Sequence, residues 1–166
     1  ASVLMAVYWF RNKELTPEVA KKEILDMAKY QQSNYGTFID TAVEDTASRL
    51  LEGYFHFSQY KIIKNASLED IIKELAAGKV IIIPLNGKEI GNPYYTPPGP
   101  ERHNLVIRGY DKEKQEFITN DPGTKRGGGF RYDIQVLYNA WRDYPTGDDK
   151  PINNKHEKNI IVIGKN

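Results

Sequence analysis

The chain has 166 residues, and its 23 Lys and Arg against 22 Asp and Glu give a formal net charge of +1. Hydrophobic residues make up 40% and charged residues 27%, which is typical of a folded globular domain and not of a disordered chain. The length favours one domain over residues 1–166. The balanced charge gives no general attraction to nucleic acid, and no apolar run is long enough for a membrane span.

Cysteine is absent, and only three histidines are present. The first fact excludes disulfides and cysteine-ligated zinc within these residues, and the second argues against a multi-histidine metal site. We therefore expect no metal and no cofactor. The pair Asp148 and Asp149 could contact a cation, but a solvated loop explains that pair better.

The opening residues predict a helix that is apolar all round, from Val3 to Phe10. Such a helix is normally buried on every side, yet its first N–H groups still need a cap. Only Ser2 is present to provide one. We infer that the chain begins inside a helix that was longer in a parent protein; the alternative is a frayed or signal-derived N-terminus.

Apolar periodicity predicts three further helices in the first half, over residues 17–32, about 41–53 and about 67–78. Each starts at a residue type that caps helices: Thr16 before Pro17, Thr41 with Glu44, and Ser67 with Asp70.

The second half is mainly strand. β-branched and apolar runs predict strands at 80–83, 105–107, 117–119, 130–132 and 160–163, with a short helix after Asp133. Helices first and adjacent strands later indicate an α+β fold, with N-terminal helices followed by a mainly antiparallel sheet. The turn at 111–114 predicts a hairpin between 105–107 and 117–119. Residues 127–129, three consecutive glycines, lack the strand–helix context of a phosphate loop and are interpreted as flexible.

This hairpin brings two chemically useful residues together. Paired positions should sum to about 225, so His103 and Asp121 fall within one residue of direct register, close enough for a cross-strand contact. A carboxylate there can accept the imidazole Nδ1–H and leave Nε2 as a base, which is two-thirds of a nucleophile–His–Asp triad. The alternative is a structural histidine and a plain turn at 121–123.

The missing nucleophile points to the opening helix. A cysteine at a helix start has its thiolate stabilised by the helix dipole, and a neighbouring imidazolium stabilises it further. A cysteine in a turn before Ala1, served by His103, would complete the set. Ser2 is the hydroxyl that remains near that point, but serine lacks the acidity for ion-pair chemistry.

Several segments together resemble the C39-like (family 2) cysteine peptidases of the papain-like clan, which are related to bacteriocin-leader peptidases. The resemblance rests on residues 1–6, 92–94, 99–100, 103–111 and 120–123. It covers the chain to about Asp133 and, more loosely, the last strand. It implies a papain-like fold, a peptide or protein substrate, and secreted or cell-surface placement.

The resemblance also implies residue roles. His103 would be the general base and Asp121 the acid that orients it, and a Cys and an oxyanion-hole Gln would lie upstream of Ala1. Asn120 competes with Asp121 for the orienting role, whereas Asp111, at the far end of the hairpin, should be structural. The 166 residues alone would then be inactive.

Other functions remain open. An acyl transferase would use the same triad, a non-catalytic peptide-binding module would keep the fold without the thiol, and a structural or interaction domain is a third possibility. The oligomeric state is undetermined. Tyr94 and Tyr95, in the proline-rich loop 86–102, are candidate substrate contacts or loop packing. His56 is expected in the core and His156 in solvent.

Overall fold

A computed structural model describes residues 1–147 and 157–165 of the chain; Asp148, Asp149 and His156 lie outside them. The helices are α1 (Ser2–Phe10), α2 (Pro17–Tyr35), α3 (Val43–Asp45), the π-helix η1 (Thr46–Tyr54), α4 (Leu68–Ala76) and α5 (Ile134–Ala140). The strands are β1 (Tyr60–Ile63), β2 (Val80–Leu85), β3 (His103–Asp111), β4 (Glu116–Asn120), β5 (Gly128–Asp133) and β6 (Ile160–Ile163).

The described strands form one antiparallel sheet in the order β1-β6-β2-β3-β4-β5. β2 and β6 lie inside the sheet and are buried throughout, as expected for continuous β-branched runs. The expected α+β fold with an antiparallel sheet is thus confirmed.

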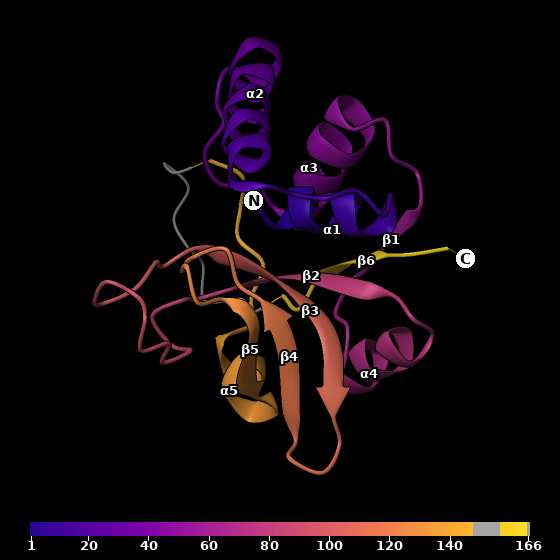
Figure 1. Cartoon of the computed structure of the whole chain (residues 1–166), viewed down its shortest axis with the longest axis vertical. Coiled ribbons are helices and arrows are strands. Elements are labelled where there is room, and N and C mark those ends of the chain that lie inside the picture. The colour runs from indigo at the N-terminus through magenta and orange to yellow at the C-terminus, as the bar shows by residue number, and fades with distance from the viewer. Residues whose placement is uncertain (148–156, 166) are drawn as a thin grey trace.

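Helices cover both faces of the sheet (Figure 1). On one face α1 and η1 pack against Val80, Ile82 and Val106, and on the other α4 and α5 pack against Ile81 and Ile107. Alternate residues of β2 therefore serve two cores, because successive side chains of a strand point to opposite faces.

Three of the predicted helix starts are present. The Thr16 hydroxyl accepts the Val19 N–H at 3.3 Å, Ser67 and Asp70 form a complete capping box, and Asp133 caps α5. The capping box predicted at Thr41 is wrong. The Thr41 hydroxyl instead pairs with that of Thr46 at 2.6 Å, and Asp143, 100 positions along the chain, accepts the Val43 N–H.

Other expectations need correction. The opening helix is not buried on every side, because Trp9 is 50% exposed. Gly53 does not end the helix; it lies within η1, where a Cβ would come within 2.5 Å of the Tyr30 hydroxyl. Gly128 and Gly129 belong to strand β5 and not to a flexible loop.

Candidate functional site

A bulge in the β3–β4 hairpin determines which side chains meet at its open end. Tyr110 pairs with Phe117, but beyond the bulge between Ile107 and Gly109 the pairing shifts to Ile107 with Thr119. Continuing that register sets Asp121 level with position 105, two residues from His103 and on the same face. The predicted sum of 225 would have put the two side chains on opposite faces, so the bulge supplies the correction.

His103 and Asp121 are in direct contact. The imidazole Nε2 lies 2.8 Å from Asp121 Oδ1, and the side chains are 9% and 0% exposed. The predicted meeting of the two groups therefore occurs, but through the other ring nitrogen. Because Nε2 faces the carboxylate, Nδ1 is the nitrogen that remains for a reacting group.

Four further groups surround the Asp121 carboxylate. Its Oδ1 accepts the Gly123 N–H at 2.8 Å, and its Oδ2 accepts the Tyr95 and Tyr132 hydroxyls, each at 2.6 Å. The Asn92 amide donates to the Tyr132 oxygen at 2.6 Å and lies 3.4 Å from Asp121 Oδ2. The carboxylate is therefore held from both oxygens and cannot rotate away from the imidazole without breaking several hydrogen bonds.

These contacts set the charge states. Burial by itself raises the pKa of the Asp121 carboxyl, but the hydrogen bonds from the imidazole and the two tyrosine hydroxyls outweigh it and leave the pKa well below its usual range. Burial, followed by the neighbouring carboxylate, raises the pKa of both Tyr95 and Tyr132. The site thus holds an ionised acceptor and two neutral donors at neutral pH.

Next to the pair lies a pocket of about 290 Å³. His103 lines it from β3, and the start of α1 lines it as well. Its described lining residues are Ala1, Ser2, Val3, Gln31, Phe38, Asp40, Thr41, Thr46, Leu50, Ile82, Arg102, His103, Asn104 and Pro122. The first N–H groups of a helix have no intrahelical acceptor, so the start of α1 can offer donors to a negatively charged atom in this pocket.

Ser2 does not act as a substitute nucleophile in this geometry. Its side chain is buried, and its hydroxyl donates to the Asn104 carbonyl oxygen at 2.6 Å. The hydroxyl proton is therefore committed to the sheet and not to His103.

The residues that the sequence left as alternatives make different contacts. Asn120 accepts the Gly129 N–H at 3.2 Å, so Asp121 and not Asn120 touches the histidine. Asp111 binds Arg131 at 2.8 Å and is structural, as expected. His56 is exposed, against expectation, because the chain adopts a left-handed φ of 49° there and buries its neighbours Phe55 and Phe57 instead.

Loop 86–102 contributes differently from the sequence prediction. Tyr95 binds the Asp121 carboxylate, and its ring packs edge-on against the His103 ring with centroids 5.6 Å apart. Tyr94 is 45% exposed, packs on Phe130 and does not line the pocket. Asn92 and Tyr132 were not anticipated as site residues, because nothing local in the sequence distinguishes Tyr132 from the other tyrosines.

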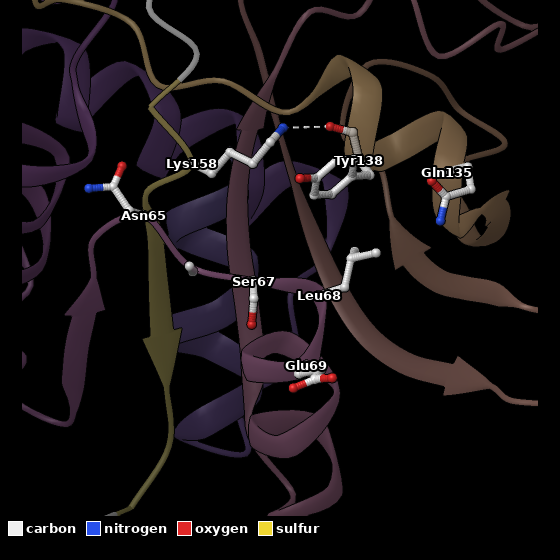
Figure 2. Close-up of a pocket in the computed structure, with 8 residues that line it drawn as sticks. Asn65, Ser67, Leu68, Glu69, Gln135, Tyr138 and Lys158 are labelled. Atoms are coloured by element: carbon white, nitrogen blue, oxygen red, sulfur yellow. Dashed lines mark hydrogen bonds between the residues drawn. The ribbon is translucent and has the colours of Figure 1, made fainter.

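A larger pocket, of about 640 Å³, lies at the start of α4 (Figure 2). Its cation, Lys158, donates to the Tyr138 and Trp141 carbonyl oxygens at 2.6 and 3.0 Å. Lys158 therefore caps the C-terminal end of α5. No residue of the His103–Asp121 site lines this pocket.

Within the described residues, no group of three or more His, Cys, Asp or Glu is arranged to hold a metal ion. No helix in that part of the chain is both long and apolar enough to cross a membrane.

The antiparallel sheet with helices on both faces, and a His–Asp pair beside a helix start, define a papain-like α+β protein. The sequence profile described as the Peptidase C39-like family matches residues 1–147, so the chain belongs to that family. This confirms the resemblance found in the sequence.

A solved structure supports the fold. The crystal structure of a Bacillus anthracis protein assigned as a C39-like peptidase superposes with a TM-score of 0.54 at 14% sequence identity. The alignment covers 80% of this chain and 64% of that one, so the present chain spans less than two thirds of that protein's length. No curated protein matches the chain.

Proposed function

We propose that this chain is the greater part of a cysteine peptidase domain in which His103 is the acid–base residue and Asp121 orients it. The observation that carries the proposal is the buried His103–Asp121 contact at 2.8 Å, beside a pocket that the start of α1 also lines. Family membership supports peptide bonds as the substrate. Residues 1–166 are proposed to belong to one domain and not to be divided between two.

The nucleophile would be a cysteine before Ala1, because the 166 residues contain none. A thiol there would sit at the α1 end of the pocket, where the helix dipole and an imidazolium stabilise the thiolate. By the same reasoning the 166 residues alone would be inactive.

The chemistry follows from these positions. The thiolate sulfur would bond to the peptide carbonyl carbon, and N–H groups near the start of α1 would stabilise the oxyanion. His103 Nδ1–H would donate its proton to the leaving amine as the C–N bond breaks. Water would then lose a proton to Nδ1 and attack the thioester, so that the carbon–sulfur bond breaks and the thiolate returns.

Asp121 would hold the ring through Nε2 during both steps and stabilise its cationic form. An amine in place of water would make the same site an acyl transferase. The absence of cysteine from these residues favours, as a second candidate, a peptide-binding module that keeps the fold without the reaction.

The test is thiol alkylation of the full-length protein with iodoacetamide. His103→Ala should slow alkylation of the cysteine before Ala1 by more than tenfold at pH 6, since an unassisted thiol of pKa about 8.5 is mostly protonated there. His56→Asn is the matched control, because His56 is exposed and asparagine tolerates its left-handed backbone. Equal rates for wild type and His103→Ala, or no cysteine before Ala1, would overturn the peptidase proposal.

A further inference from the structure

Gln31 is a buried polar residue that the proposed reaction does not use. It lies on α2, is 6% exposed, and lines the same pocket as His103. Its Oε1 is buried and has no hydrogen-bond partner. Buried polar atoms in folded proteins are nearly always paired, so an unpaired amide oxygen in a pocket calls for an explanation.

Four other polar side chains that line the pocket are already paired. The hydroxyls of Thr41 and Thr46 lie 2.6 Å apart, and Arg102 binds Asp40 at 3.2 Å. Among the described side chains that line the pocket, only that of Gln31 has a buried polar atom without a partner. The unpaired amide oxygen of Gln31 is therefore specific to this residue and is not shared by the other described side chains that line the pocket.

Apolar surface lies beside this amide. Phe38 is 52% exposed although it lines the pocket, and Leu50 and Val3 line it as well. A carboxamide next to exposed apolar surface matches an extended peptide, which presents a backbone N–H next to each side chain. A small polar substrate would use the amide but leave the Phe38 ring in water.

We propose that Gln31 is a substrate-positioning residue: its Oε1 accepts a backbone N–H of the bound peptide while an apolar side chain of that peptide packs on Phe38. This inference rests on the proposed function, because it assigns a peptide to the pocket beside His103. It gives α2 a role in recognition and leaves the bond-breaking steps to His103 and Asp121.

The test compares Gln31→Leu with Gln32→Leu in the full-length protein. The two glutamines are neighbours on α2, but Gln32 is exposed and its amide N–H donates to the Gly36 carbonyl oxygen. Two substrates are used: an internally quenched decapeptide with a central leucine, whose apolar side chain suits the Phe38 surface, and p-nitrophenyl acetate, which has no peptide N–H.

Gln31→Leu should raise KM for the decapeptide by roughly 5- to 10-fold, the effect of one neutral hydrogen bond, with kcat little changed. Acylation by p-nitrophenyl acetate should stay at the wild-type rate, and Gln32→Leu should match wild type with both. The melting temperature of Gln31→Leu should not fall, because the substitution removes an unpaired buried polar atom.

An unchanged KM would overturn the inference, as would equal losses with both substrates accompanied by a lower melting temperature, which would make Gln31 structural. If the wild-type protein turns over neither substrate, the proposed function fails instead. Fluorescence anisotropy of the labelled decapeptide then decides on Gln31 separately: weaker binding by Gln31→Leu than by Gln32→Leu supports it, and equal or no binding contradicts it.

Discussion

At the scale of single residues, Asp121 is the centre of the site. It accepts hydrogen bonds from an imidazole, two phenol groups and a backbone N–H while its side chain is fully buried. Hydrogen bonds to a charged group are stronger than those between neutral groups, which is how a buried carboxylate can stay ionised. The two tyrosines therefore act on the histidine indirectly: their hydroxyls hold the Asp121 carboxylate, and the carboxylate holds the imidazole.

The lowered pKa of the Asp121 carboxyl makes the stability of the protein depend on pH. Asp121 titrates at lower pH in the folded protein than in the unfolded chain, where a carboxyl of this kind has a pKa of about 3.9. Its contribution to stability is therefore complete above that value and is lost as the pH falls toward the folded-state pKa. Asp121→Asn should lower the free energy of unfolding at pH 7 by roughly 1.5–3 kcal/mol, the range for one charge-assisted hydrogen bond.

Thermal melts of the 166-residue chain between pH 7 and pH 3 measure this effect. The melting temperature of the wild type should fall more steeply below pH 5 than that of Asp121→Asn, so the two curves converge. Glu113→Gln, in the exposed turn 112–115, should run parallel to wild type. Parallel curves for Asp121→Asn would show that the carboxyl titrates normally in the folded state.

The sequence could predict part of this site. That His103 and Asp121 lie near each other follows from one turn and an approximate strand register, both of which are local. That their side chains share a face of the sheet does not, because it depends on the bulge between Ile107 and Gly109. The partnership of Asn92 with Tyr132 joins residues 40 positions apart, and no spacing rule connects them.

At the scale of elements, the turn after β4 brings backbone close to the reactive groups. A Cβ on Gly123 would lie 2.9 Å from Tyr95 Cε1, 3.0 Å from His103 Cε1 and 3.1 Å from Asp121 Oδ1. These separations are shorter than ordinary packing contacts, so at least one of the three groups would have to shift. The lack of a side chain at Gly123 therefore lets the turn pass close to the imidazole and the carboxylate.

Gly123→Ala should therefore displace the imidazole or the carboxylate while the fold persists. In the full-length protein we expect kcat/KM for peptide hydrolysis to fall by about 100-fold, the scale of a 1 Å misplacement of a catalytic group. Gly128→Ala is the matched control, because a Cβ there meets nothing within 4 Å. Circular dichroism should show both variants folded; full activity in Gly123→Ala would mean that the His103 position is not critical.

Element predictions succeeded where the signal was local. The Ser67–Asp70 capping box and the buried strand β2 each lie within a short continuous stretch of sequence, so they could be predicted from that stretch alone. The start of α3 could not be read in this way, because its N–H groups bind Thr146 and Asp143 from the far end of the chain.

At the scale of the whole molecule, the sheet separates two cores, and the site lies at one end of β3 where helix α1 begins (Figure 1). The α+β class was predictable from helices that precede strands. The strand order was not, because β6, from the end of the chain, inserts between β1 and β2. That insertion covers one edge of β2, and β3 pairs with the other.

The central claim is that His103 and Asp121 serve a thiol held at the start of α1. The most direct measurement is the intact mass of the full-length protein after reaction with a peptidyl vinyl sulfone, with the modified residue located by fragmentation. We predict one adduct, on a cysteine before Ala1, that forms at least tenfold more slowly in His103→Ala, as expected when thiolate formation depends on the imidazole. No adduct on such a cysteine, or the same rate in His103→Ala, would contradict the account.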